Sequence, residues 1–253
     1  MNDRNRLSAL VRPDKFLGKQ ASEAFAELIC VHQSISKVKI CYYEAPPSLQ
    51  KRVKMSRLEE ELVNAALKIR KEVGMPFWEA LFAACLKAGR FTNPLLDAAL
   101  LHQGPGSKKQ ILRADVLAGK LTEIANKKSE GKAVGFLSEV KLKSGELLHF
   151  VFLDFHCEVS GENTKLVSAI CSRLLSGGFL LLDSGDSYHA WGTQLVSSSE
   201  RVKLLSRSLF FMPIIDGIYI AHQLIQDASS IRISVGGQRN CAPQVIRVQV
   251  SGV

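Results

Sequence analysis

Side chains that could do chemistry follow apolar runs in the second half of the sequence. The first run is Phe152-Leu153-Asp154-Phe155-His156, in which an acid and an imidazole stand two positions apart. Because side chains alternate along a strand, Asp154 and His156 are expected on one face, with Leu153 and Phe155 pointing into the core. A carboxylate and an imidazole on one face can share a divalent metal ion. The alternative is two ordinary polar residues on a solvated sheet face.

A second group lies in the stretch Asp183-Ser184-Gly185-Asp186-Ser187-Tyr188-His189-Ala190-Trp191. The dipeptide Gly185-Asp186 predicts a tight hairpin turn. Ser187, His189 and Trp191 then share one face of the outgoing strand, where the serine and the histidine could bind a phosphate. A hairpin with ordinary polar residues explains the same pattern.

Two further charged residues stand beside apolar runs. Asp216 follows Phe211-Met212-Pro213-Ile214-Ile215, and it is either a helix cap or a site carboxylate. Arg232 lies within the apolar strand Ile231–Ser234, where an unpaired guanidinium would cost desolvation energy. A carboxylate or phosphate partner is therefore expected for Arg232. If that partner is Asp154 or Asp216, the role of Arg232 is purely structural.

The elements that must position these residues are predicted from periodicity and turn signals. The second half is expected to form strands and three helices in the order ββαββαβαββ, with hairpin turns at Lys143-Ser144-Gly145-Glu146 and at Gly185-Asp186. The expected strands are 134–142, 147–155, 179–182, 187–193, 210–215, 230–234 and 245–250, and the helices are 163–177, 197–209 and 218–226. The first part, ββαββ, is typical of a mixed sheet with helices on one face. The predicted fold class is therefore α/β of the α+β type.

The first half is expected to be mostly helical. Ser56 followed by Glu59 is a capping-box signature that opens a helix closed by Gly74. The remaining helices are expected at 14–33, 76–89, 93–101 and 114–128, with a short strand at 38–43. Residues 1–132 are predicted to be a basic, mostly helical region, and residues 133–253 the core. The two could form one compact domain together.

The order of the pieces resembles the archaeo-eukaryotic primase superfamily, which includes primase-polymerases, and a divergent bacterial primase-like member in particular. The resemblance is carried by Asp154 at a strand end, the Ser187–His189 hairpin and Asp216 after an apolar strand. The tail Ile231-Arg-Ile-Ser also resembles primase-like bacterial relatives. The resemblance covers about residues 134–250. It implies an RRM-like ββαββ catalytic core beside an N-terminal α/β unit.

The resemblance also implies roles for these residues. Asp154 and Asp216 match metal-binding acids, and Ser187 and His189 match residues that hold the phosphates of the incoming nucleotide. The family's second acid in the first motif is His156 here. This departure removes one negative charge, which should lower affinity for Mg²⁺ and favour Mn²⁺ or Zn²⁺. Catalysis could survive with one ion, or the site could be degenerate.

The expected function is a metal-dependent nucleotidyltransferase resembling a primase-polymerase. Asp154, His156 and Asp216 would be the catalytic residues and bind Mg²⁺ or Mn²⁺, while Ser187, His189 and Arg232 would hold the triphosphate. The partners expected are a single-stranded nucleic-acid template and nucleotides, with a 3′-hydroxyl as the attacking group.

Two other functions stay open at this point. One is a catalytically degenerate nucleic-acid-binding module of the same fold, in which Tyr188, Trp191 or Phe155 is exposed and stacks on bases. The other is a metal-dependent hydrolase that uses Asp154, His156, His189 and Asp216. It would need a second histidine at the metal, and alternation places His149 on the opposite face.

Composition narrows the class of protein. The chain has 253 residues and a net charge of +9, which favours a polyanionic partner. The basic excess falls in the first half, at positions 51, 52, 54, 57, 108, 109, 113, 127, 128 and 132. No apolar run reaches the length of a membrane span, and no secretory signal begins the chain, so a cytoplasmic location is expected.

Known motifs are missing as well. The six cysteines form no CxxC pair, which counts against a zinc ribbon and indicates reduced thiols. There is no GxSxG, no GxGxxG after the first strand and no P-loop. Serine hydrolase, Rossmann and P-loop functions are therefore disfavoured.

Overall fold

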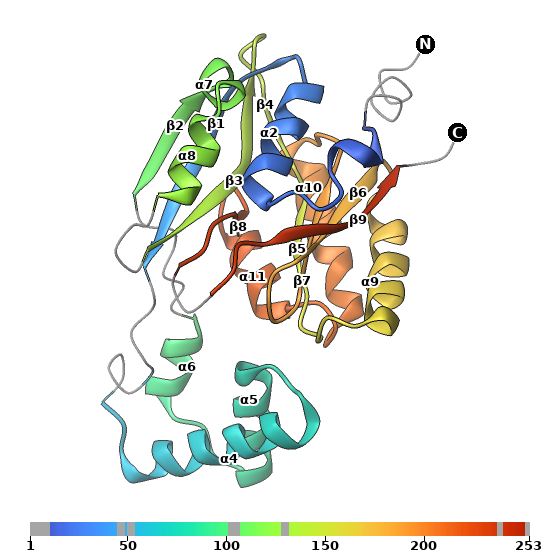
Figure 1. Cartoon of the computed structure of the whole chain (residues 1–253). Coiled ribbons are helices and arrows are strands. Elements are labelled where there is room, and N and C mark those ends of the chain that lie inside the picture. The colour runs from blue at the N-terminus through green and yellow to red at the C-terminus, as the bar shows by residue number, and fades with distance from the viewer. Residues whose placement is uncertain are drawn as a thin grey trace. The chain divides into compact units, whose positions relative to one another are not determined.

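A computed structural model describes residues 11–44, 49, 54–100, 107–127, 132–236 and 240–250 (Figure 1). Lys51, Arg52 and Lys128, three of the basic residues noted above, lie outside the described residues. The chain forms two compact units, one from residues 1–45 and 105–253 and one from residues 46–104. The sequence divides the chain at residue 132, whereas the units have their boundaries near residues 45 and 105.

The larger unit contains two sheets. The first has the order β2-β1-β3-β4, with β8 also paired to β3. Its strands are β1 (Ile35–Glu44), β2 (Lys108–Leu112), β3 (Lys132–Leu142), β4 (Leu147–His149) and β8 (Ser230–Arg232). The second has the order β5-β7-β6-β9. Its strands are β5 (Phe152–Asp154), β6 (Gly178–Asp183), β7 (Tyr188–Gly192) and β9 (Gln244–Val250).

The α+β fold class is confirmed. The detail of a mixed sheet is wrong for the described strands, because every pairing among them is antiparallel. The expected ββαββ order is present, but its strands are divided between the two sheets. The reason is that the expected strand 147–155 breaks at Phe150 and Val151, so that β4 pairs with β3 and β5 pairs with β7.

Two hydrophobic cores hold the unit together. The first lies between the sheets and helices α2 (Ala21–Val31), α7 (Arg113–Leu117) and α8 (Lys120–Asn126), and it contains Phe25, Phe136 and Trp191. The second lies on the other face of the β5-β7-β6-β9 sheet, under α9 (Gly161–Leu174), α10 (Ser198–Ser208) and α11 (Gly217–Ile225). Phe152 faces the first core and Leu153 the second, as strand alternation requires.

Local signals predict most helices, and three expectations are wrong. The single helix expected at 14–33 is divided, because α2 begins only at Ala21 after a short 3-10 helix and a turn. The segment 210–215, expected as a strand, contains the end of the short 3-10 helix η2 (Leu209–Phe211) followed by a turn. The expected helix 114–128 is divided into α7 and α8 at Gly119, whose φ of 87° is left-handed. A second 3-10 helix, η1 (Pro13–Lys15), precedes α2. None of the described helices combines the length and apolar character that crossing a membrane requires.

The smaller unit is helical and has its own core. It contains α4 (Arg57–Val73), α5 (Phe77–Ala88) and α6 (Asn93–Leu100). The predicted capping box is confirmed, since Ser56 and Glu59 satisfy each other's backbone amides and Gly74 ends the helix in the left-handed conformation. Its buried side chains are Leu62, Val63, Ala66, Ala80, Leu81, Ala84, Cys85 and Leu95.

A buried arginine ties α10 to α11 and β8 in the larger unit. The Arg201 guanidinium donates to the carbonyl oxygens of Gln223 at 3.0 Å and Gln226 at 2.9 Å, and to the Ser229 hydroxyl at 3.2 Å. Ser229 in turn donates its amide to the Ser138 hydroxyl on β3. These bonds satisfy the terminal nitrogens of the buried guanidinium, whereas its buried Nε makes no hydrogen bond within the described residues.

The same network includes His149 at the end of β4. Its Nδ1 lies 3.3 Å from the Ser138 hydroxyl and its Nε2 lies 3.0 Å from the Ser198 hydroxyl. Burial, and then the nearby charge of Arg201, lower the pKa of His149 to about 4. The imidazole is therefore neutral at pH 7, and it joins α10 to β3 and β4.

We expect His149 to make the folded protein sensitive to acid. Unfolded histidine titrates near 6.5 and folded His149 near 4, so the unfolded state takes up the proton first as the pH falls. Its contribution to stability is complete above the unfolded pKa and is lost as the pH falls toward the folded one. Between pH 7 and pH 5 this group should remove about 2 kcal/mol from the free energy of unfolding.

Urea denaturation of the wild type and of His149→Gln, each at pH 7 and pH 5, measures this contribution. The decrease in the free energy of unfolding from pH 7 to pH 5 should be about 2 kcal/mol smaller in the variant, since glutamine does not titrate. An equal fall in both proteins would show that His149 does not carry the effect.

Candidate functional site

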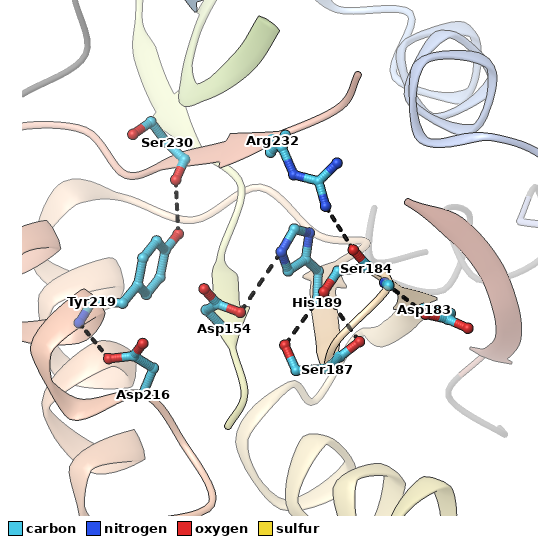
Figure 2. Close-up of polar contacts among 10 residues, drawn as sticks. Asp154, Asp183, Ser184, Ser187, His189, Asp216, Tyr219, Ser230 and Arg232 are labelled. Atoms are coloured by element: carbon cyan, nitrogen blue, oxygen red, sulfur yellow. Dashed lines mark hydrogen bonds and ion pairs between the residues drawn. The ribbon is translucent and has the colours of Figure 1, made fainter. Parts of the chain in front are cut away.

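The strand β5 has antiparallel neighbours on both edges, and this fixes three side chains in a row. On one edge Asp154 lies directly opposite His189 of β7. On the other edge Phe155 forms a bridge with Ile215, and the Asp216 amide donates to the Asp154 carbonyl at 3.0 Å. Directly opposite residues point to the same face with Cβ atoms about 5 Å apart. Figure 2 shows Asp216, Asp154 and His189 in this order.

The row contains a neutral imidazole beside a carboxylate. His189 is 6% exposed, whereas the side chain of Asp154 is 27% exposed, so solvent reaches the acid. Burial, and then the charge of Arg232, lower the pKa of His189 to about 3. Its Nε2 lies 3.7 Å from Asp154 Oδ1, which is too long for a hydrogen bond. The pair is therefore a contact between a neutral ring and a carboxylate at pH 7.

One nitrogen of His189 is left without a partner. Among the described residues, Nδ1 is buried and makes no hydrogen bond. An unsatisfied buried polar atom costs about 1–3 kcal/mol. A ligand that accepted or donated a hydrogen bond there would remove this cost, which makes His189 a candidate binding group.

Arg232 is held by backbone carbonyls rather than by an acid. Its guanidinium donates to the oxygens of Ser184 at 2.6 Å, Ser234 at 2.7 Å and Cys241 at 2.7 Å. Three backbone carbonyls therefore accept the hydrogen bonds of the guanidinium, in place of the carboxylate expected from the sequence. Burial lowers the pKa of Arg232, and its charge still lies close enough to Asp154 for the two to attract each other.

The predicted hairpin turn is confirmed between β6 and β7. Asp183 Oδ1 accepts from the Gly185 amide at 2.8 Å, and Gly185 has a φ of 104°, which favours glycine. Ser184 donates both its amide and its hydroxyl to the Ser187 carbonyl. Ser187 is half-buried, with its hydroxyl 3.3 Å from that of Ser184. The turn and Arg232 together fix the start of β7 and thus His189.

Asp216 is confirmed as a helix cap, and its role as a site carboxylate stays a prediction. Its Oδ1 accepts from the Tyr219 amide at 2.8 Å and caps α11, while its backbone pairing places it opposite Asp154. One carboxylate oxygen can cap a helix while the other stays available to a ligand.

His156 lies just beyond the end of β5. Its amide donates to the Ile214 carbonyl at 2.7 Å, which continues the pairing that aligns Asp154 with Asp216. Within the described ranges, no group of three or more His, Cys, Asp and Glu side chains is placed to hold a metal ion. The register thus brings two of the predicted ligands together, and a ligand role for His156 stays a prediction.

Two tyrosines that sequence patterns do not predict as site residues lie beside the site. The Tyr219 hydroxyl donates to the Ser230 carbonyl at 3.0 Å, and burial, then the charges of Asp154 and Asp216, raise its pKa. Tyr43 on β1 forms a hydrogen bond with the Ser230 side chain, and burial raises its pKa. Tyr219 could have been found from its position three residues after the helix cap. Tyr43 gives no local signal, because it reaches the site through the sheet.

The aromatic residues expected to stack on bases are buried. Tyr188 and Trp191 are fully covered and Phe155 is 1% exposed. Tyr188 and Phe155 pack in the second core and Trp191 in the first. The specific expectation that these three rings form a base-stacking surface is therefore wrong.

The comparisons with known proteins bear on the same segment. A family model described as archaeo-eukaryotic primase 1D-like matches residues 115–243, which include all the predicted site residues. No curated protein and no solved structure gives a match.

We expect the two roles of Asp216 to be separable by substitution. Asp216→Ala removes the cap of α11 and should lower the free energy of unfolding by about 1 kcal/mol. Asp216→Asn keeps an oxygen that can accept from the Tyr219 amide, so its stability should stay close to that of the wild type. Guanidinium denaturation of the three proteins tests this, and equal losses in both variants would contradict a capping role.

Proposed function

The chain belongs to the archaeo-eukaryotic primase 1D-like family, and on that premise we propose that it is a metal-dependent nucleotidyltransferase of the primase-polymerase type. The reaction extends a 3′-hydroxyl with a nucleotide from a triphosphate, directed by a single-stranded nucleic-acid template. The observation that carries the proposal is the row Asp216, Asp154, His189, with the Arg232 charge beside it.

Asp154 and Asp216 are proposed to hold the divalent cation, Mg²⁺ or Mn²⁺. Two carboxylates directly opposite each other, one of them partly open to solvent, fit such an ion. Mg²⁺ in polymerase sites commonly takes one or two protein carboxylates and completes its shell with substrate phosphates and water. Within the described residues, no third His, Cys, Asp or Glu side chain completes a metal-binding group with these two acids, and such an arrangement needs none. If His156 is a further ligand, its imidazole favours Mn²⁺.

The cation would supply activation of the 3′-hydroxyl and neutralisation of charge on the phosphates. The protein contributes the geometry. Asp154 and Asp216 are fixed by backbone pairing on adjacent strand segments, so their spacing needs no rearrangement when substrate binds. Charges that folding has already oriented lower the activation barrier of the reaction, because they do not have to be reoriented when the transition state forms.

His189, Ser187 and Arg232 are proposed to hold the triphosphate. The neutral imidazole of His189 can place a proton on Nδ1, which is otherwise without a partner among the described residues, and donate it to a phosphate oxygen. The Ser187 hydroxyl is half-buried near the same turn. Arg232 keeps N–H groups beyond its three carbonyl bonds, and its positive charge is fixed beside the ring.

Nucleotide incorporation tests the proposal directly. Labelled nucleotide, a single-stranded template with or without a primer, and either Mg²⁺ or Mn²⁺ should give extended product from the wild type and none in chelator. Asp154→Asn and Asp216→Asn should each reduce the rate about a hundredfold or more, because they remove charge where it is needed in the transition state. Unchanged rates in both variants, with folding verified by circular dichroism, would remove the basis of the proposal.

A second measurement concerns His189. His189→Ala should raise the KM for the nucleotide about tenfold, since a hydrogen bond to a charged phosphate is lost. The KM for the template should stay at the wild-type value. His189→Gln, which can still donate, should recover part of the loss, and a change in template KM instead would place His189 elsewhere in the reaction.

A further inference from the structure

One face of the β2-β1-β3-β4 sheet is covered by helices, and the other carries lysines. The helices α2, α7 and α8 lie over one face of this sheet (Figure 1). Val38 and Ile40 of β1 belong to the buried core beneath them. By alternation, Lys37, Lys39 and Cys41 point to the opposite face. This opposite face, called here the lysine face, continues across the neighbouring strands in register.

The register defines three rows on the lysine face. The first row crosses four strands as Leu112, Lys37, Lys141 and Leu147. Leu112 is 51% exposed and Leu147 is 50% exposed, so both ends of this row project into solvent. Lys141 is exposed as well.

The second and third rows lie progressively nearer the site. The second contains Gln110 opposite Lys39, and Lys39 forms an ion pair with Glu139. The third contains Lys108, Cys41, Gly135 and Arg232 in directly opposite positions. The lysine face therefore ends at Arg232, the residue beside His189 and Asp154.

Tyr43 joins the last row to the site. A Cβ at Gly135 would overlap the ring of Tyr43, which shows that this ring lies over the glycine. The phenol then reaches the Ser230 side chain on β8, next to Tyr219 and the carboxylates. On the β4 side, α10 covers the face where Ser198 contacts His149. Toward β1 and β2, Lys108 is exposed and Lys37 is half-buried, whereas Cys41 between Lys108 and Gly135 is covered.

We propose that the lysine face binds the phosphate backbone of single-stranded nucleic acid and leads it toward Asp154. The charge of this face supports a polyanion, since Lys37, Lys108 and Lys141 make no ion pair with any acid in the described part of the chain, whereas Lys39 is neutralised by Glu139. A sheet face with uncompensated lysines in two rows suits a flexible strand, and the contact is to phosphate rather than to bases. This inference rests on the proposed function, because it gives that site its template.

The test compares two triple variants of the full-length protein. The first carries Lys37→Gln, Lys108→Gln and Lys141→Gln. The control carries Lys165→Gln, Arg173→Gln and Lys203→Gln, which are exposed positions on α9 and α10. Each set lowers the net charge from +9 by 3, to +6, so a general charge effect cancels.

Binding of labelled single-stranded DNA and RNA oligonucleotides is measured by fluorescence anisotropy at several salt concentrations. The first triple variant should bind at least one of them about tenfold more weakly than the control. Its log–log salt slope should be smaller by about 2, since each lost phosphate contact on a single strand removes about 0.7. In the incorporation assay its KM for template should rise while its KM for nucleotide stays unchanged.

The outcomes separate this inference from the proposed function. Equal binding and equal salt slopes in the two triple variants would overturn the lysine face as the binding surface, whatever the activity of the wild type. Loss of binding in the first variant without any incorporation by the wild type would support the lysine face and count against the enzyme. Circular dichroism and thermal denaturation of both variants exclude unfolding as the cause.

Discussion

The backbone pairing on both edges of β5 is the constraint on which the site depends. Asp154 has His189 opposite it in the β5–β7 ladder, and its carbonyl accepts the Asp216 amide on the other edge. The relative positions of these side chains are therefore set by main-chain hydrogen bonds, which are stiffer than side-chain torsions. Residues far apart in the chain are therefore placed side by side, as the proposed cation and triphosphate sites require. The second core under α9, α10 and α11 supports this row from behind, so the geometry is fixed before any substrate binds.

Electrostatics at the site follow from the burial of His189 and from one half-buried cation. The guanidinium of Arg232 is partly desolvated, and three carbonyls from the β6–β7 turn and the chain after β8 hold it in place. Its charge, added to burial, keeps His189 neutral, and it attracts Asp154. A neutral ring retains one donor and one acceptor, whereas a protonated ring would pair with Asp154 and neutralise it. Arg232 thus keeps the carboxylate available and adds positive charge where the proposed triphosphate would lie.

Sequence patterns predict the elements better than they predict their partners. The capping box at Ser56, the turn at Gly185 and the strand alternation around Asp154 depend on neighbouring residues, and each is confirmed. The break after His149 has no such local signal, because an apolar run looks the same whether it serves one sheet or two. The strand β2 gives no apolar signal, because four of its five residues are exposed and three of them are polar. The apolar segment 210–215 gives the opposite problem, since its composition is typical of a strand whereas it contains the end of η2 and a turn. The carbonyl partners of Arg232 and the approach of Tyr43 come from the tertiary fold, which no local spacing encodes.

The strand β3 connects the two surfaces of the proposed enzyme. Along one edge it pairs with β1, which carries lysines, and along the other edge its residues Gly135–Leu137 pair with β8, which carries Arg232. Gly135 stands where these pairings meet, and only a residue without a side chain leaves room for the Tyr43 ring to cross toward Ser230. Because β3 pairs with β1 on one edge and with β8 on the other, the lysines of β1 and Arg232 of β8 are held in one continuous hydrogen-bonded sheet. A nucleic-acid strand bound on the proposed lysine face would therefore approach Arg232, and the Asp154 charge that Arg232 attracts, along a single sheet.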